Sequence, residues 1–351
     1  MALLLKDIQY QVENALKELI WDLEREHCLK TRYPLLYEWI EKFVLRKGKN
    51  VRSSLFVMAF SGFTGKIPAN LFRSAGALEL AHDFTLIHDD LIDRADMRRG
   101  APALHTRINR YIKSLNQAAT VRGEDVSLVV GDILYALAMR EFLSIEADPE
   151  RKITALNIFL ETGFLTGNGQ FVELMNGLRA VSEMTEAEIY RPYDLKTAYY
   201  TFAGPLACGA VLAGAPKPAS DSLFQAGIIL GRAYQIRDDI LDLFHGNDAG
   251  NETVFNDIVE SKRTILLHYA YHHADKRDRA FLDRLLSSTT LLNDDFLHYR
   301  EIIERSGSLA HARGEIQSLV DQIFSSGALA AMNGQVAGQV VAYTRDLLTA
   351  E

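Results

Sequence analysis

Apolar residues recur at three- and four-residue spacing through most of the 351-residue chain, and no other feature of the sequence restricts its fold as strongly. This spacing lines apolar side chains along one face of an α-helix. The chain has only 8 prolines, and proline interrupts both helix interiors and central strands. Long helices are therefore favoured over strands, and the sequence predicts an all-α protein.

The pattern predicts helices over seven stretches and loops between them. The helices are expected at residues 35–48, 51–65, 75–96, 127–145, 153–177, 186–215 and 221–246. A charged loop with Gly and Pro is expected at 97–107, and the polar loop at 246–257 is the best candidate for a mobile flap. No Gly/Ser linker or abrupt change in composition marks a boundary. We therefore expect one domain over residues 1–351, with its motifs within 48–264.

The composition excludes several classes of protein. Hydrophobic residues make up 48% and charged residues 24%, which is typical of a soluble globular domain. The formal net charge of -8 gives no electrostatic help in binding nucleic acid or an anionic membrane surface. No stretch approaches the roughly 18 to 20 uncharged apolar residues that span a bilayer. The two cysteines, Cys28 and Cys208, show no pairing or metal-ligand spacing, so a reducing cytoplasm is expected.

One acidic pattern occurs twice on apolar helices. The segment IHDDLID at 87–93 has a close counterpart in IRDDILD at 236–242. Asp89 and Asp93 are one helical turn apart and share a face, as do Asp238 and Asp242. Like charges at this spacing repel by roughly 0.2 to 0.5 kcal/mol, so two such faces need a cation nearby. Mg²⁺ prefers hard oxygen ligands and is commonly completed by substrate phosphates. Two solvated helix faces are the alternative interpretation.

Further polar residues extend each acidic face into a stripe that is expected to line a cavity. The first stripe comprises His82, Asp89, Asp93 and Asp96, and the second comprises Gln235, Asp238 and Asp242. A core histidine with a local partner is the alternative for His82. Basic residues that could bind phosphate accompany the stripes. They are Lys49, Arg52, Arg98, Arg99, Lys196 and Lys262. Each of them alone could also be a solvated surface charge.

From residue 49 to residue 262 the chain resembles the trans-isoprenyl diphosphate synthase (polyprenyl synthetase) family. LIHDDLIDRADMRRG at 86–100 resembles the first aspartate-rich motif of the family with its arginine pair, and YQIRDDILD at 234–242 resembles the second. Other landmarks occur in the family's order. They are GKNVR at 48–52, the position of His82, GNGQFVE at 167–173, KTAYYTF at 196–202 and DxxxxK from Asp257.

The resemblance implies a single-domain orthogonal helical bundle around a deep cavity, usually a homodimer, in which isopentenyl diphosphate is condensed with an allylic diphosphate. Small-residue helices such as LACGAVLAGA would suit a dimer interface. Metal coordination by three Mg²⁺ ions, with Mn²⁺ as an alternative, is implied for Asp89, Asp93 and Asp238, with Asp90, Asp239 and Asp242 supporting. The allylic substrate would be held by Arg98, Lys196, Thr197, Gln235 and Lys262. Isopentenyl diphosphate would be held by Lys49, Arg52, His82 and Arg99.

Three departures from the family pattern stand out. Ser53 occupies the position where the family usually has proline, which we expect to be a minor change at a helix start. Asn109 and its neighbours do not continue the usual sequence after the arginine pair. The glycine-lysine pair ahead of the last lysine is missing, since the loop reads GNETVFND. One cation for the allylic phosphate is therefore expected to be absent.

Product length in the family depends on the residue five before the first motif aspartate. That residue is Phe84. A bulky aromatic there, with a short DDxxD motif, resembles the type that makes geranylgeranyl diphosphate (C20). Farnesyl diphosphate (C15) is the second candidate for the product. The alternative interpretation of Phe84 is an ordinary core phenylalanine.

Other functions remain open. A class I terpene cyclase shares the fold and first motif, but its second motif has an Asn/Asp, Ser/Thr and Glu triad that DDILDLFHG lacks. A non-catalytic subunit of a heteromeric synthase usually loses one acidic cluster, and both are intact here. A carboxylate-bridged di-iron bundle needs a Glu-x-x-His pair that is absent around these acids. A head-to-head synthase would carry different aspartate motifs.

Overall fold

A computed structural model describes residues 3–68, 70–98, 100–244, 255–288 and 290–349. Helices dominate, so the expected all-α fold is confirmed. The chain forms two compact units. Unit 1 contains residues 1–156 and 208–215, and unit 2 contains residues 157–207 and 216–351. Most of the loop expected to be a flap, residues 246–257, lies outside the described residues.

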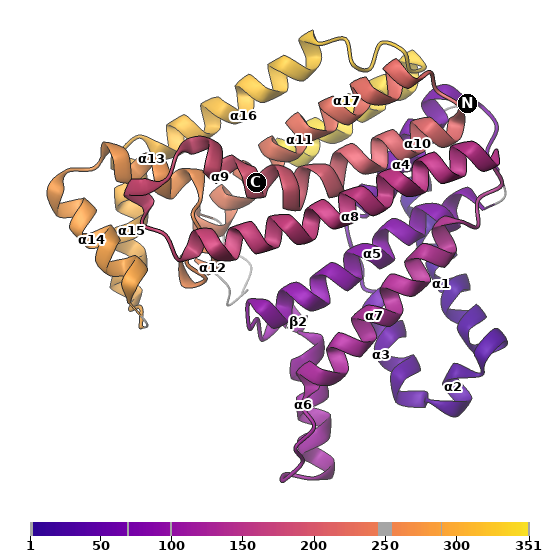
Figure 1. Ribbon diagram of the computed structural model, residues 1–351, viewed down its shortest axis with the longest axis horizontal. Coiled ribbons are helices and arrows are strands. Elements are labelled where there is room, and N and C mark those ends of the chain that lie inside the picture. Colours follow the sequence, from indigo (N-terminus) through magenta and orange to yellow (C-terminus); the bar gives the residue numbers. More distant parts are fainter. Residues whose placement is uncertain (1–2, 69, 99, 245–254, 289, 350–351) are drawn as a thin grey trace. The chain divides into compact units, whose positions relative to one another are not determined.

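The elements follow one another along the chain as follows (Figure 1). The first part contains α1 (Leu5–His27), α2 (Leu29–Arg32), α3 (Pro34–Val44), α4 (Val51–Phe63), α5 (Leu71–Ile92), β1 (Met97–Arg98), β2 (Ala101–Pro102), α6 (Leu104–Leu115) and α7 (Gly123–Phe142). The middle part contains α8 (Pro149–Gly177), η1 (Val181–Glu183), α9 (Glu186–Pro192), the π-helix η2 (Tyr193–Ala203), α10 (Gly204–Ala213) and α11 (Lys217–Phe244). The last part contains α12 (Asn256–Val259), α13 (Ile265–His273), α14 (Lys276–Ser287), α15 (Asn293–Arg305), α16 (Ser308–Ser325) and α17 (Gly334–Thr349).

Unit 1 is organised around α5, which is apolar on most of its surface. It packs along α7 and also contacts α1 and α4. Phe56 of α4 and Phe142 of α7 are fully buried, with ring centroids 6.3 Å apart. α5 is covered on several sides, and it holds the turn that carries Asp89 and Asp90 at its C-terminal end.

Unit 2 is organised around α11, which contacts η2 and α16. Its core is a continuous cluster of buried aliphatic and aromatic residues that includes Ile236 and Ile240 of α11, Ile265 and Leu266 of α13, and Ile302 of α15. The buried isoleucines flank the acidic residues of IRDDILD on the same helix. Burial of these neighbours fixes the rotation of α11, and so decides which way its aspartates point.

Three expectations about the elements need correction. The helix expected at 186–215 divides into α9, η2 and α10, with Pro192 ending α9. The helix expected at 75–96 ends at Ile92, because Arg94 has a φ of 54° and reverses the chain, so Asp96 does not continue the acidic stripe. The stretch expected to be a loop at 97–107 contains two elements. One is an antiparallel ribbon in which Met97 faces Pro102, and the other is the start of α6.

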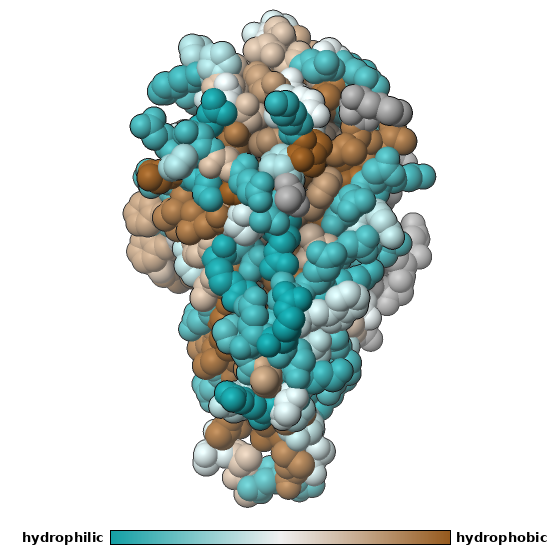
Figure 2. All heavy atoms as spheres, turned by 90° about the vertical axis from the view of Figure 1, so that its right-hand side faces the viewer, coloured by the Kyte–Doolittle hydropathy of each residue, from teal (hydrophilic) through white to brown (hydrophobic). Residues whose placement is uncertain are grey.

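The surface carries both hydrophilic and hydrophobic side chains. On the face drawn in Figure 2, hydrophilic side chains predominate and hydrophobic groups interrupt them. Within the described ranges, none of the helices combines the length and apolar character that a membrane crossing requires. Five residues of the segment LACGAVLAGA are buried within the chain, namely Leu206, Ala207, Cys208, Ala210 and Leu212. The expectation that this segment could form a dimer interface stays a prediction.

Candidate functional site

The first acidic cluster lies at the C-terminal end of α5 in unit 1. Asp89 and Asp90 belong to the last turn of the helix, and Asp93 caps it by donating its N–H to the Asp89 carbonyl at 2.8 Å. Arg98 returns from β1 to these acids, with Nη2 2.5 Å from Asp90 Oδ1 and 3.4 Å from Asp89 Oδ2. The structure thus brings four of the expected residues together. Arg99 lies outside the described residues.

Asp90 is the most deeply buried acid of this cluster, with 1% of its surface exposed. Burial raises the pKa of Asp90, although the Arg98 guanidinium opposes the shift. Asp90 Oδ2 is buried and has no hydrogen-bond partner among the residues described, and the same holds for Nδ1 of neighbouring His105. A buried carboxylate oxygen that has no donor is stabilised by added positive charge. This end of α5 therefore suits a cation.

The residues expected to bind isopentenyl diphosphate also lie in unit 1. Lys49 is exposed and precedes α4, whereas Arg52 is half-buried in its first turn. Between them Asn50 adopts a left-handed conformation with a φ of 48°, which asparagine tolerates better than most residues. Gln9 of α1 holds this turn by donating to the Lys49 carbonyl at 3.0 Å. His82 is half-buried on α5 in the same unit.

Phe84 is a half-buried residue of α5 whose ring contacts two other aromatic rings. Its centroid lies 4.4 Å from that of His88 and 5.1 Å from that of Tyr135 on α7. Gly131 allows this approach, because a Cβ atom there would lie 2.7 Å from His88 Nε2 and 3.5 Å from Phe84 Cδ2. Phe84 is therefore held between α5 and α7 rather than in the deepest part of the core.

In unit 2, two glycines of α11 bring η2 against the second acidic helix. A Cβ atom at Gly231 would collide with the Cα of Ala198, and one at Gly227 would collide with the Cα of Ala203. Only glycine permits this backbone approach. Since Gln235 follows Gly231 by one helical turn, the close packing sets Gln235 beside the part of η2 that carries the lysine and threonine of KTAYYTF.

A chain of hydrogen bonds joins these two helices. Thr197 Oγ1 donates to Gln235 Oε1 at 2.7 Å, and Gln235 Nε2 donates to Asp239 Oδ1 at 3.0 Å. The Tyr193 hydroxyl donates to Asp239 Oδ2. The Ile265 N–H donates to the same tyrosine oxygen at 2.9 Å. Both oxygens of Asp239 thus accept bonds from the protein, and burial raises the pKa of this carboxyl well above its usual range.

The other two acids of the second cluster differ in their surroundings. The Asp238 side chain is 39% exposed, and Arg237 Nη1 lies 3.1 Å from it. Asp242 accepts bonds from the Asn256 and Asp257 N–H groups, each at 3.2 Å, and so caps α12. Burial, reinforced by the charge of Asp257, raises the pKa of Asp242 to about 7. Asp238 is therefore the acid of this motif that is most open to solvent.

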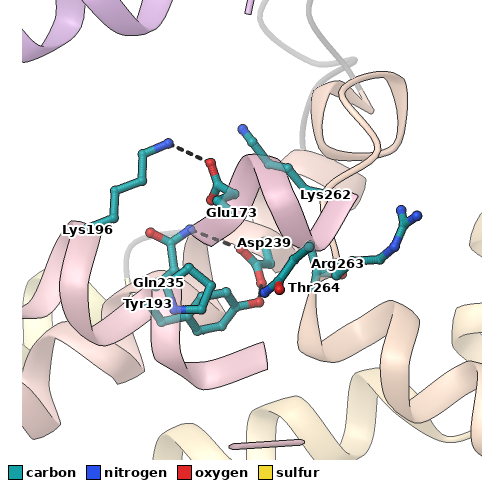
Figure 3. Close-up of a pocket in the computed structure, with 10 residues that line it drawn as sticks. Glu173, Tyr193, Lys196, Gln235, Asp239, Lys262, Arg263 and Thr264 are labelled. Atoms are coloured by element: carbon teal, nitrogen blue, oxygen red, sulfur yellow. Dashed lines mark hydrogen bonds and ion pairs between the residues drawn. The ribbon is translucent and has the colours of Figure 1, made fainter. Parts of the chain in front are cut away.

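Two lysines lie near this cluster, each paired with an acid. Lys196 Nζ lies 2.8 Å from Glu173 Oε1 (Figure 3). Lys262 Nζ lies 2.6 Å from Glu260 Oε2 and 3.5 Å from Asp257 Oδ1. They line one pocket of about 440 Å³, solvent space included, together with Glu173, Asn176, Pro192, Tyr193, Gln235, Asp239, Arg263 and Thr264. Lysines in such pairs can exchange a carboxylate for a phosphate oxygen.

Sequence reasoning missed several residues of this pocket. Glu173 could have been predicted from the sequence, because it is the last residue of the motif GNGQFVE. Tyr193, Asn176 and Thr264 gave no signal, since nothing in their local pattern separates them from other helical residues. Arg263 points away from the other labelled side chains in Figure 3 and donates to the Gly177 carbonyl at 2.7 Å. It therefore supports the end of α8 rather than the pocket interior.

The carboxylates do not form a complete metal site by themselves. Within the described ranges, no group of three or more His, Cys, Asp or Glu side chains is arranged to hold a metal ion. Mg²⁺ commonly binds through one or two carboxylates and is completed by water and substrate phosphates, so it does not require such a group.

Comparison with known proteins relates the chain to one family. A family model described as Polyprenyl synthetase matches residues 33–302. The geranylgeranyl diphosphate synthase of Methanosarcina mazei is 29% identical over 248 residues, which cover 71% of each protein. The short chain isoprenyl diphosphate synthase of Methanothermobacter thermautotrophicus is 28% identical over 311 residues, covering 88% of this chain and 86% of that protein.

The fold is also similar to that of solved structures. One is geranylgeranyl pyrophosphate synthase from Corynebacterium glutamicum, complexed with isoprenyl diphosphate and magnesium. Its TM-score is 0.89 at 24% identity, and the match covers 99% of this chain and 100% of that one. At this level of identity the likeness establishes the fold.

Proposed function

The chain belongs to the polyprenyl synthetase family, and we propose that it is a short-chain trans-prenyltransferase that condenses isopentenyl diphosphate with an allylic diphosphate. The observation that carries this proposal is the pocket of unit 2, where Lys196 and Lys262 stand beside an acidic helix face. Opposite charges around an open pocket suit a substrate that is anionic and metal-bound. Residues 1–351 act as one polyprenyl synthetase domain.

Ionisation of the allylic diphosphate is the first step of the proposed reaction. Mg²⁺ supplies electrostatic stabilisation of the departing diphosphate when it is bound. Asp89, Asp93 and Asp238 would hold it, with three ions expected and Mn²⁺ as an alternative. Asp90, Asp239 and Asp242 would support or orient the ions. Their burial and their bonds to protein donors support this division of roles. The solved structure from Corynebacterium glutamicum is complexed with magnesium, which supports the use of this ion.

The cationic residues bind the two diphosphates. Lys196 and Lys262 exchange their carboxylate partners for oxygens of the allylic diphosphate, and Arg98 does the same from the first cluster. Lys49, Arg52, His82 and Arg99 hold isopentenyl diphosphate. Lys49 is more exposed than Arg52 and His82, which suits the capture of a ligand from solvent.

The allylic cation is attacked by the double bond of isopentenyl diphosphate, and the diphosphate product removes the proton. The carbonyl oxygen of Gln235 and the backbone near Thr197 stabilise the cation, because their negative ends can face it. Water must be excluded at this stage, since it would convert the cation to an alcohol. Phe84 limits growth of the chain, and the product is C20, with C15 next.

A second copy of the chain is the proposed partner, in a cytoplasmic homodimer. An apolar stripe on α8 supports this assembly. It contains Leu160, Phe164, Phe171, Leu174 and Met175, which are all exposed, and the two phenylalanines are each 63% exposed. Exposed apolar surface of this kind marks an interaction site. A Phe164→Glu, Phe171→Glu variant is expected to elute as a monomer with the wild-type circular dichroism, and a dimer unaffected by both charges would exclude this interface.

A product assay tests the proposal as a whole. Purified protein is given isopentenyl diphosphate with a C5, C10 or C15 allylic diphosphate, with and without Mg²⁺, and the products are sized by mass spectrometry. Mg²⁺-dependent elongation that stops at C20 is the expected result. Absence of elongation with every primer would overturn the proposal and favour a non-catalytic partner subunit or a cyclase.

A further inference from the structure

Tyr193 links three elements of unit 2 through its single hydroxyl group. It is the first residue of η2, and its side chain is buried. The hydroxyl donates to Asp239 of α11 and accepts from the N–H of Ile265, the first residue of α13. Figure 3 shows its ring close to Gln235 and Asp239, and Tyr193 is one of the residues that line the pocket. Its position is therefore next to the proposed reaction site, although it carries no charge itself.

We propose that Tyr193 is a positioning residue for the prenyl transfer, which orients the Gln235 amide and Thr197 through Asp239. This inference rests on the proposed function. It assigns a role to a residue that belongs to neither aspartate-rich motif. Tyr193 acts through its neighbours. It contacts Asp239, and Asp239 contacts the amide group of Gln235, whose oxygen would face the substrate.

The direction of each hydrogen bond follows from the chemistry of the groups. A backbone N–H can only donate, so the Tyr193 oxygen accepts from Ile265 and its own proton goes to Asp239. Gln235 Nε2 donates to Asp239 Oδ1, and the carbonyl oxygen of Gln235 accepts from the Thr197 hydroxyl. Each group in this chain of hydrogen bonds therefore has a fixed role as donor or acceptor. Removing the tyrosine hydroxyl removes the donor to Asp239 Oδ2.

Removal of this hydroxyl has consequences at both of its ends. The Ile265 N–H lies at the start of α13, where no helical carbonyl is available to accept it. Asp239 Oδ2 would lose its donor in buried surroundings, and a buried acceptor without a donor reorganises or recruits water. Either change frees the carboxylate to rotate, and Gln235 then no longer has a fixed amide orientation.

The chain provides a matched control in Tyr190. Its ring packs edge-on against that of Tyr193 with centroids 5.9 Å apart, and both rings are buried. The Tyr190 hydroxyl, however, has no hydrogen-bond partner within the part of the chain that the structure describes. Tyr190→Phe and Tyr193→Phe therefore delete the same atom from adjacent sites. Only the second deletion breaks the network.

The experiment compares wild type, Tyr193→Phe and Tyr190→Phe in steady-state product formation across a Mg²⁺ titration. Loss of a group that supports a metal-binding residue costs about 10- to 100-fold in activity or metal affinity. We expect this loss in kcat/KM for Tyr193→Phe, with more Mg²⁺ needed for half-maximal rate. Tyr190→Phe should match the wild type. Tyr193→Phe with wild-type kcat, KM and Mg²⁺ dependence would overturn the proposal, even if its melting temperature falls.

A double-mutant cycle with Thr197→Val tests whether Tyr193 acts through the network. Residues in one hydrogen-bonded network give non-additive effects. The fold-losses in kcat of Tyr193→Phe and Thr197→Val should therefore not multiply in the double variant. Losses that multiply would show two independent effects and would exclude the proposed route through Asp239 and Gln235.

A binding readout separates failure of this inference from failure of the proposed function. The probe is Mg²⁺ with inorganic pyrophosphate, and the measurement is the shift in melting temperature of each variant. If the wild type makes no prenyl product but is stabilised by the probe, a smaller shift in Tyr193→Phe than in Tyr190→Phe still supports positioning. Equal shifts in the two variants, or no shift in the wild type, would overturn it.

Discussion

Ser53 donates two hydrogen bonds to one oxygen of buried Glu79. Its N–H lies 2.9 Å and its hydroxyl 2.7 Å from Glu79 Oε1. The pair ties the first turn of α4, which carries Arg52, to α5 one turn before His82. Proline, which the family resemblance led us to expect at position 53, could make neither bond. The serine therefore gives the buried Glu79 carboxylate donors that a proline would remove.

Ser53→Pro should destabilise the protein by roughly 1–3 kcal/mol, because Glu79 would keep a buried oxygen without its two donors. Urea unfolding measures the change, and Ser53→Ala should lie between wild type and Ser53→Pro, since it keeps the N–H bond. Ser54→Ala is the matched control. Ser54 is equally buried, but its hydroxyl has no partner among the described residues. A Ser53→Pro variant as stable as Ser54→Ala would contradict the assignment.

Replacement of Asp89 or Asp238, one acid from each motif, should abolish most activity without unfolding the protein. Asp89→Ala or Asp238→Ala is expected to lower kcat by about 100- to 1,000-fold, as loss of a group that stabilises transition-state charge does. Circular dichroism should be unchanged. Asp221→Ala, an exposed aspartate on the same helix as Asp238, is the control and should behave as wild type. Normal turnover by either motif variant would remove that acid from the proposed metal site.

Phe84→Ala should lengthen the product, because removal of the ring held between His88 and Tyr135 opens space on that side of α5. Mass spectrometry of products from a C15 primer would then show chains beyond C20. Phe84→Tyr keeps the ring and should keep the wild-type product. If the alanine variant makes the same products as the wild type, Phe84 is an ordinary packing residue.

Ser261→Gly should stabilise the protein. Ser261 has a φ of 56°, a left-handed conformation that costs a residue with a Cβ roughly 1–2 kcal/mol and glycine almost nothing. After allowing for the greater freedom of glycine in the unfolded chain, we expect a gain of roughly 0.5 kcal/mol or more in the free energy of unfolding. Ser222→Gly, within helix α11, should have the opposite sign. A loss of stability in Ser261→Gly would contradict the strain argument.

The capping box of α9 should make stability depend on pH. Arg179 and two bonds involving Thr185 hold the pKa of Glu188 at about 2, below its ordinary value of 4.5. A carboxyl group with a lowered folded-state pKa stabilises the fold above its unfolded pKa, and this contribution is lost as the pH falls toward the folded value.

The difference in unfolding free energy between wild type and Glu188→Gln should therefore be constant above pH 5 and disappear between about pH 4.5 and 2. Urea titrations at several pH values measure it. Thr185→Ala should lose part of the same pH dependence, because it removes one of the bonds that lower the pKa. A difference that does not change over this range would contradict the role of ionised Glu188.

The sequence was sufficient for most of the helical architecture and for the two acidic clusters, because both depend on spacing along the chain. Helical periodicity places Asp89 near Asp93, and Asp238 near Asp242, whatever the helices pack against. The same local signals failed at residues 186–215. There a continuous apolar pattern concealed the π-helix η2, since its register is set by the approach of Gly227 and Gly231 to its backbone.

Only the tertiary structure decided which side chains support the acids. Tyr193 reaches Asp239 across 46 residues and Ser53 reaches Glu79 across 26, and neither residue stands out in its own segment. Apolar periodicity shows that a helical face is buried, but it does not show which residue lies opposite each polar atom on that face. That choice depends on the rotation and approach of packed helices, which many distant contacts determine together. The sequence by itself therefore determined where the charged chemistry lies, and packing determined how it is held.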